Sequence, residues 1–349
     1  MNEIGRNLKR IRLLKNLSLE KAGNLLNMSA PAIAKYEKGQ IVPNSEKLIE
    51  FANAYSVKVL DLLKTHNAPE MKFNAFRKRQ RLQGQNLELL KEIIQNKVSD
   101  YLEVIELNKL EINSSKIKKY ACNNADGAEF AALEFRKDYK LSINQPIPNL
   151  INILENIGIL IIQIDNPDNR FKDFDGLSEI VNNVPIIVLL NGIDGERQRF
   201  TIAHELGHLV LNIKDDNLDE EKMCNKFASA LLMPKKAIIN EFGISRNNIS
   251  FYELRAFKQE YKVSMASIVY RLKELGIIKE HLFKKINISF SANGLKKHEP
   301  YPIDPEETYQ FNKLVHKLEV DNIISLNRAC ELLGITIDEY NTEDNNYRY

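Results

Sequence analysis

The segment His204-Glu205-Leu206-Gly207-His208 constrains this chain more than any other part of it. On a helix, side chains at positions i and i+4 lie on one face, so both imidazoles can reach a single Zn²⁺. Glu205 then lies beside a water on that metal and can act as its general base. The chain has only 6 histidines, which disfavours the alternative of two ordinary helix histidines at this spacing. We therefore expect His204 and His208 to be zinc ligands and Glu205 to be catalytic.

A catalytic zinc site has three protein ligands and one open position, so the two imidazoles need a third partner. The metzincin continuation is excluded, because Leu211 stands where that motif needs a glycine and Lys214 where it needs a third histidine. The remaining candidates are acidic residues on the helix expected next, Asp219, Glu220 and Glu221.

Glu221 is the preferred third ligand. On that helix it shares a face with Asn225 and Ala228, at i, i+4 and i+7, and the small alanine leaves room beside a metal. Glu220 lies about 100° round the helix, so only one of the two glutamates should aim at the zinc. An acidic first turn favoured by the helix dipole is the alternative that needs no metal.

Charge is distributed unevenly along the 349 residues. Residues 1–64 hold 11 Lys and Arg against 6 Asp and Glu, a net charge of +5. The whole chain carries +2, which leaves −3 for the remainder. A basic N-terminal module on a mildly acidic body suggests a local contact with nucleic acid.

Cysteine usage and hydropathy favour a cytoplasmic protein with no membrane segment. The three cysteines lie far apart and form no C-x-x-C pair, so we expect neither a disulfide framework nor a cysteine zinc site. Basic residues interrupt the apolar stretch that a signal peptide would need near the N-terminus. The longest apolar runs, Ile157–Ile164 and Pro185–Leu190, are too short to span a bilayer.

Residues 1–66 are expected to form a compact all-α domain, because apolar residues recur there at helical spacing. Ser18 can cap one short helix and Ser29 the next. The early Pro31 is tolerated because first-turn amides have no intrahelical acceptor. Asn27 suits a tight turn between the two helices, and this arrangement predicts a helix-turn-helix.

The same residues resemble the XRE-type (Cro/cI-like) repressor domains. The resemblance rests on Ile4-Gly5, Leu17-Ser18, Met28-Ser29, Ile33, Tyr36-Glu37, Gly39, Pro43 and Leu48. In such domains the helix after the turn enters the major groove of an operator. The resemblance implies that Ala30, Ala32 and Lys35 face base edges. It also implies that Ser29 and Lys38 hold phosphates. A homodimer is compatible with the resemblance, which does not fix the oligomeric state.

One departure from this pattern concerns Leu19, which stands where such domains usually carry a DNA-contacting glutamine. The apolar Ala30, Pro31 and Ala32 offer few hydrogen bonds to bases. The expectation is therefore DNA binding of low affinity or low specificity, with a protein-interaction role as the alternative.

Residues 67–138 are expected to be a basic linker followed by a helical segment. The basic stretch at about 65–82 favours a solvated linker over an additional DNA-binding patch. Asn123–Gly127 predicts a turn inside the helical stretch.

Residues 139–284 change period and are expected to form a mixed α+β domain. A helix over Asn149–Asn156 precedes an apolar strand over Ile157–Ile164. Phe174–Ser178 leads toward a second strand, Pro185–Leu190. The strands predict a small sheet whose edge could accept an extended peptide by main-chain hydrogen bonds. The metal-binding helix is expected to run from near Arg197 to Leu211.

This region resembles the ImmA/IrrE family of zinc metallopeptidases. The resemblance rests on Phe174-Asp175-Gly176-Leu177-Ser178, Arg197–His208, Glu221, Asn225, Phe227-Ala228, Leu231–Pro234, Val263-Ser264, Tyr270-Arg271-Leu272 and Leu275-Gly276. It implies a gluzincin-like peptidase with His204, His208 and Glu221 on Zn²⁺ and Glu205 as general base. It also implies a protein substrate, because members of the family typically cut a partner XRE-type repressor.

Three further positions are interpreted beside this resemblance. Tyr270 and Arg271 are candidates for transition-state support, and a structural ion pair is the alternative for Arg271. Asn212 stands where relatives often have another histidine, so no ligand role is assigned to it.

Residues 285–349 are expected to be mostly helical. Ile286–Phe290 is interpreted as an extended beginning, and residues 305–340 as helical. The pattern through Gly334-Ile335-Thr336 imitates a second helix-turn-helix, which we interpret first as a helical packing unit and second as a partner or DNA contact.

The sequence therefore predicts a multidomain chain: an all-α helix-turn-helix domain, an α+β zincin-like (gluzincin-type) peptidase domain and a helical C-terminal region. The leading functional hypothesis is a DNA-binding zinc endopeptidase that cleaves an XRE-type repressor and so derepresses genes. A regulator whose zinc domain senses a ligand or metal without cutting is the alternative, and one half of a toxin–antitoxin or phage-immunity pair is a third. The intact Glu205 favours catalysis, because a pure binding site would not need that carboxylate.

Overall fold

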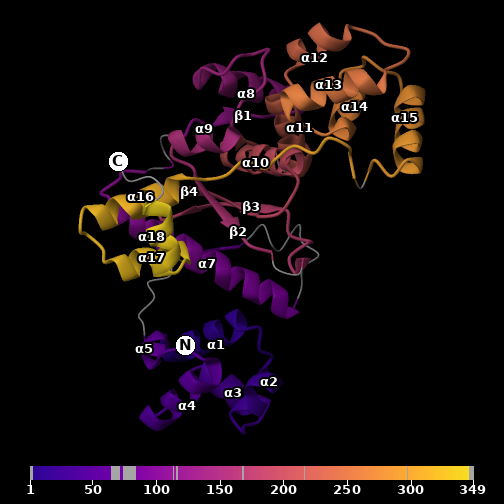
Figure 1. The fold of residues 1–349 in the computed structure, drawn as a ribbon. Helices are drawn as coiled ribbons and strands as arrows, with labels where there is room; N and C mark the ends of the chain where they lie inside the picture. The colour runs from indigo at the N-terminus through magenta and orange to yellow at the C-terminus, as the bar shows by residue number, and fades with distance from the viewer. Residues whose placement is uncertain are drawn as a thin grey trace. The chain divides into compact units, whose positions relative to one another are not determined.

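A computed structural model describes residues 3–63, 71–73, 84–112, 114, 117–166, 169–215, 217–296 and 298–345. The chain forms two compact units (Figure 1). Unit 1 comprises residues 1–110, 167–174 and 315–349, and unit 2 comprises residues 111–166 and 175–314. Most of the basic stretch at 65–82 lies outside the described residues.

Unit 1 begins with a bundle of short helices. They are α1 (Glu3–Leu14), α2 (Leu19–Leu25), α3 (Ala30–Glu37), α4 (Ser45–Tyr55) and α5 (Val59–Leu63). Ser18 and Ser29 accept hydrogen bonds from the backbone amides of Lys21 and Ala32, so both predicted caps are present. Asn27 has a φ of 52°, a left-handed conformation that asparagine tolerates in a turn.

The core of this bundle combines apolar packing with one buried ion pair. Leu8, Ile33 and Phe51 are fully buried within it. Arg12 on α1 donates to both carboxylate oxygens of Glu37 on α3, at 2.5 and 2.9 Å. The pair fixes α1 against the end of α3, the helix expected to contact DNA.

Unit 1 also contains α7 (Gly84–Leu107) and three C-terminal helices, α16 (Gln310–Val320, which begins in unit 2), α17 (Leu326–Leu333) and α18 (Ile337–Asn345). Arg328 on α17 donates to Glu103 on α7 at 2.6 Å. Gly334 ends α17 with a left-handed φ of 72°. Helix 17 thus packs on a helix more than 200 residues earlier, as the packing interpretation of this segment expects.

Unit 2 contains a three-stranded sheet. Its order is β2 (Leu160–Ile164), β4 (Val184–Leu190) and β3 (Gly176–Val181), with β4 parallel to β2 and antiparallel to β3. Every residue of β4 is buried, as its continuous apolar sequence predicts for a central strand. The segment around Gly176 had been expected only to lead toward a strand, but it forms the edge strand β3 itself.

Helices cover this sheet and extend away from it (Figure 1). They are α8 (Ala125–Asp138), α9 (Leu150–Asn156), α10 (Gly195–Val210), α11 (Glu220–Leu232), α12 (Lys235–Phe242), α13 (Phe251–Tyr261), α14 (Met265–Glu274) and α15 (Glu280–Ala292). Helix 10 packs on β3 and β4 on one side and on α11 on the other. Two short strands, β1 (Tyr120–Ala121) and β5 (Leu211–Asn212), pair in parallel where α10 ends.

Two local predictions were wrong, and the helical region expected over 305–340 begins only at Gln310. Asn123–Gly127 is not a turn within a helix, because Asn124 caps the N-terminus of α8 and the helix starts at Ala125. Ile286–Phe290 is helical within α15 and not extended. Leu282, Ile286 and Phe290 are spaced at i, i+4 and i+8, a helical period that a five-residue window hides.

The predicted domain boundaries at 138/139 and 284/285 fall inside unit 2. Its core includes Ile117 and Ala128 before the first boundary and Phe290 after the second. Residues 299–309 belong to it as well, as an irregular segment, here called the strap, that runs from the end of α15 to α16. No helix in the described part of the chain is long and apolar enough to cross a membrane.

Candidate metal centre

Helix 10 positions the two histidines. It begins two residues earlier than expected, at Gly195, and ends at Val210. Its buried side includes Ala203, Leu206 and Val210, while His204 and His208 are only partly buried, with side-chain exposures of 13% and 9%. The i, i+4 spacing therefore presents both imidazoles on one partly open face, as predicted.

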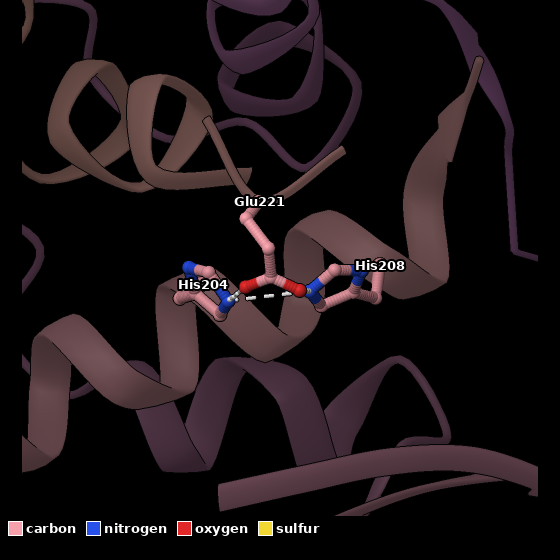
Figure 2. Close-up of side chains that lie close together, drawn as sticks. All are labelled: His204, His208 and Glu221. Carbon is pink, nitrogen blue, oxygen red and sulfur yellow. Dashed lines mark hydrogen bonds and ion pairs between the residues drawn. The ribbon is translucent and has the colours of Figure 1, made fainter. Parts of the chain in front are cut away.

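Glu221, in the first turn of α11, completes the cluster. Figure 2 shows its carboxylate between the two imidazoles. His204 Nε2 lies 3.2 Å from His208 Nε2 and 3.3 Å from Glu221 Oε2. The distance from His208 Nε2 to Glu221 Oε1 is 3.8 Å. Each of the three residues thus offers one donor atom to a common point.

The spacing of these atoms fits a divalent metal. Zn–N and Zn–O bonds of 2.0–2.1 Å in a tetrahedron place ligand atoms about 3.3 Å apart. The three measured separations lie within about half an ångström of that value. Two imidazoles and a carboxylate are also a donor set that zinc favours, and they leave a fourth position for substrate or water.

Helix 11 also orients both imidazoles, through contacts to the Nδ1 atom of each ring. Asn225 Oδ1 lies 3.0 Å from His204 Nδ1, and Glu220 Oε1 lies 2.8 Å from His208 Nδ1. These contacts place the N–H on Nδ1 and leave each Nε2 lone pair directed at the metal position. Cys224 Sγ is a further neighbour of His208 Nδ1, at 3.3 Å.

The two glutamates therefore have different surroundings. Glu221 faces both Nε2 atoms, whereas Glu220 contacts the opposite side of one ring. This division agrees with the predicted 100° between their side chains. The orienting contacts of Glu220, Asn225 and Cys224 were not predicted, although the i+4 relation between Glu221 and Asn225 was a usable signal.

Glu205 lies on the sheet side of α10 and is 3% exposed. Ser178 on β3 donates a hydrogen bond of 2.6 Å to Glu205 Oε2. A carboxylate next in sequence to a candidate ligand histidine, and held by a neighbouring strand, is placed to exchange protons at the site. The motif predicted Glu205, but not its partner on β3.

The two residues considered for transition-state support differ in their environment. Tyr270 is 57% exposed, and its ring packs edge-on against Phe283. Arg271 is fully buried, and its guanidinium donates to Glu129, Glu274 and the carbonyl of Met233. Burial would lower the pKa of Arg271, but these carboxylates outweigh it and raise the pKa. The structure thus places Arg271 in the ion-pair arrangement considered as its alternative.

The N-terminal end of α10 is held by the strap. Arg199, 1% exposed, pairs with the buried Glu306. The same Glu306 carboxylate accepts from the amides of Leu150 and Ile151 at the start of α9, at 2.7 and 2.9 Å. Gln198 exchanges two hydrogen bonds with the Glu306 backbone. Local sequence carries no signal for this pairing, because its partners are 107 residues apart.

The residues expected to contact DNA lie together on or beside α3. Ser29 caps the helix, Lys35 and Lys38 are exposed, and Ala30 and Ala32 are partly buried. The structure therefore presents two basic side chains and few polar groups on this helix.

The comparisons with known proteins agree with both domains. Residues 154–273 match the IrrE N-terminal-like domain of the M78 peptidases, and residues 8–62 match a helix-turn-helix model. Residues 154–273 are thus an IrrE/ImmA-like domain and residues 8–62 a helix-turn-helix domain, which confirms the two resemblances.

Among curated proteins, the chain is similar to two radiation response metalloproteases named IrrE. It is 33% identical to that of Deinococcus radiodurans over 117 residues, covering 29% of this chain and 34% of the relative. It is 34% identical to that of Deinococcus deserti over 106 residues, covering 25% and 36%. The chain thus spans about a third of the length of these relatives.

Solved structures add little to this comparison. A Mycobacterium tuberculosis transcriptional regulator is 15% identical, with coverage of 42% of this chain and 46% of that one and a TM-score of 0.29. A likeness at that level supports no inference.

Proposed function

We propose that this protein is a zinc-dependent endopeptidase with a gluzincin-like ligand set, which cleaves an XRE-type repressor and thereby derepresses genes. The observation that carries the proposal is the convergence of His204, His208 and Glu221 beside the buried Glu205. The similarity of residues 154–273 to the IrrE domain supports the same class of reaction.

The residues have separable roles in this proposal. His204, His208 and Glu221 hold the metal, and Asn225 and Glu220 keep the imidazoles oriented. When bound, Zn²⁺ would polarise the scissile carbonyl and make a water more acidic. Glu205 accepts a proton from the attacking water and delivers it to the nitrogen of the leaving amine as the peptide C–N bond breaks. Glu205 thereby returns to its ionised state. As an edge strand of the sheet, β3 offers a place for an extended substrate segment.

In this proposal the helix-turn-helix domain recruits the peptidase to DNA. Arg12 and Glu37 fix α1 to the end of α3, and Lys35 and Lys38 offer charge to phosphates. DNA binding by this domain would concentrate a cytoplasmic peptidase near a repressor on the same operator. A substrate with an N-terminal domain like the chain's own fits this arrangement.

Co-expression with candidate repressors that carry an XRE-type domain tests cleavage. The native, zinc-loaded chain is expected to cut the repressor, and Glu205→Gln is expected to bind zinc without cutting. Chelation of the metal should stop the native reaction, and adding zinc back should restore it. If native and variant chains both hold zinc and neither cuts, the non-cleaving sensor becomes the better assignment.

Gel shifts with the DNA upstream of the gene for this chain test whether the helix-turn-helix domain binds DNA. Lys35→Ala combined with Lys38→Ala should weaken binding and reduce its salt dependence, by a slope of roughly one per lost phosphate contact. Lys284→Ala with Lys285→Ala, on α15, removes the same charge from unit 2 and is the matched control. Equal retention by all three proteins would contradict docking of α3 on DNA.

A further inference from the structure

Strand β3 passes directly beside the proposed general base. Gly176 and Ser178 are two residues apart on this strand, so both face the same side of the sheet. That side is the one on which α10 packs. The segment Phe174–Ser178 contributed to the family resemblance, but no function has been attached to Gly176 or Ser178.

Gly176 allows the strand to approach α10 closely. A Cβ at this position would lie 2.7 Å from Thr201 Cγ2 and 3.2 Å from Glu205 Cγ. A side chain there would have to displace the Thr201 methyl group, and with it either the strand or the helix. The glycine therefore sets the distance between β3 and Glu205.

Ser178 uses this proximity to hold the carboxylate. Its Oγ lies 2.6 Å from Glu205 Oε2, a short hydrogen bond typical of a hydroxyl donating to a charged oxygen. An ionised carboxylate has no proton to donate, so the hydroxyl must be the donor. The bond occupies one oxygen of Glu205 and limits rotation of its carboxylate.

A second contact ties the same segment to α10. Asp175 Oδ1 accepts a hydrogen bond of 2.5 Å from Arg197, which lies one turn before Thr201 on α10. Both side chains are largely exposed, so this pair adds little stability by itself. It does hold the start of β3 beside α10, in the relative position in which Ser178 contacts Glu205.

We propose that Ser178 is a positioning residue for the general base: its hydroxyl fixes Glu205 Oε2, so that Oε1 is presented for proton transfer, and Gly176 provides the close approach that this requires. The inference rests on the proposed peptidase function. It adds to that function a residue on the sheet that acts through Glu205 and does not touch the metal.

The test compares Ser178→Ala and Ser178→Thr with the native full-length chain. Alanine removes the hydroxyl, whereas threonine keeps it and suits a strand. Ser291→Ala on α15 is the control, because it removes a hydroxyl that donates to the Asn287 carbonyl away from the site. Zinc content is measured for all four proteins, and so are kcat and KM on a purified XRE-type repressor that the native chain cuts. Crystal structures of the zinc-loaded native and Ser178→Ala chains are compared at Glu205.

We expect Ser178→Ala to keep its zinc and its KM but to lose about 10- to 100-fold in kcat, because a misplaced catalytic group slows the chemical step. Ser178→Thr should recover most of that loss, and Ser291→Ala should match the native chain. In the crystals, the Glu205 carboxylate of Ser178→Ala should leave its native position.

The outcomes separate this inference from the proposed function. An active native chain whose Ser178→Ala variant has native kcat overturns the inference and leaves the peptidase standing. If the native chain cuts no more than Glu205→Gln, the peptidase proposal fails, and the crystals still decide the role of Ser178. An unmoved Glu205 in Ser178→Ala would then overturn the inference on structural grounds.

Discussion

The two ends of α10 are supported in different ways. At its C-terminal end, the imidazoles contact Asn225 and Glu220 on α11, only 21 and 12 residues away in sequence. At its N-terminal end, Arg199 and Gln198 contact Glu306 on the strap, more than 100 residues away. The contacts that orient the candidate metal ligands are therefore local in sequence, whereas the contacts that support the rest of the helix are long-range.

The chemical character of the two ends differs as well. The metal end is partly open, with Glu221 41% exposed, as a site that admits a substrate requires. The strap end is closed, because Lys258 is fully buried between Glu196 and Glu299 and Arg199 lies against Glu306. Burial lowers the pKa of the Arg199 guanidinium although Glu306 opposes that shift. The C-terminal half of α10 thus carries the partly open candidate metal site, and its N-terminal end is held in place by buried ion pairs.

Glu306→Ala should give the largest effect and tests whether the strap supports the domain. Removing the carboxylate leaves a buried guanidinium and two α9 amides without their acceptor, which should lower the free energy of unfolding by about 3–5 kcal/mol. Urea denaturation of the full chain measures it. Glu307→Ala, at the neighbouring exposed position, should change stability by less than about 0.5 kcal/mol. Equal stabilities of the two variants would mean that the strap is not structural.

Glu221→Ala and Glu220→Ala test the metal end. If Glu221 is a ligand, Glu221→Ala should not bind one zinc per chain at zinc concentrations that saturate the native chain. If Glu220 only orients His208, Glu220→Ala should bind zinc roughly 10- to 100-fold more weakly than the native chain. Competition with a chromogenic chelator measures both affinities. A larger loss for Glu220→Ala than for Glu221→Ala would reverse the two roles.

Gly195→Ala and Gly207→Ala compare the two ends by the same substitution. A Cβ at Gly195 would lie 2.4 Å from the Asp304 carbonyl oxygen of the strap, and backbone cannot easily move. A Cβ at Gly207 would lie 3.2 Å from Cys224, a contact that small shifts can relieve. We expect Gly195→Ala to destabilise the chain by roughly 1–3 kcal/mol, since overpacking exceeds the helix propensity gained. Gly207→Ala should cost less, and thermal unfolding of both variants checks the order.

The smallest expected effect concerns acid stability, through the ion pairs that hold α8 and α11 to α14. Burial acts to raise the pKa of Glu129, but hydrogen bonds and charges of Arg271 and Lys226 outweigh it and lower the pKa below its ordinary 4.5. Glu129 thus stabilises the fold above that ordinary value, and the contribution disappears as pH falls through the lowered pKa.

Glu129→Gln should therefore be less stable than the native chain at neutral pH and lose less stability on acidification below pH 4.5. Unfolding by urea across this range measures the difference. Glu134→Gln on the same helix, whose partner Lys137 is largely exposed, is the control. Parallel pH curves for the native chain and Glu129→Gln would show that Glu129 has no lowered pKa.

Much of the local structure was predictable from short stretches of sequence. Ser18, Ser29 and Asn149 each cap the helix that follows them, because capping depends on a few adjacent residues. The spacing of His204 and His208 placed both rings on one helix face for the same local reason. The preference for Glu221 over Glu220 as third ligand followed from the geometry of one further helix.

The misses arose where a window was too short or a partner too distant. Ile286–Phe290 looked extended because its β-branched residues mask a period that only Leu282 reveals. Ser178 and Glu306 could not be connected with Glu205 and Arg199, since the partners are 27 and 107 residues apart. Side-chain periodicity reports the backbone conformation of one segment and carries no information on which other segment packs there.

By itself, the sequence determined the helix-turn-helix, the helix that carries His204 and His208, and the candidate metal ligands, because each is encoded by residues within a few turns of one another. The tertiary structure alone decided how β3 meets the general base and how the strap closes the other end of α10. Those contacts depend on burying charged and polar groups against distant backbone, and their geometry exists only once the chain has folded.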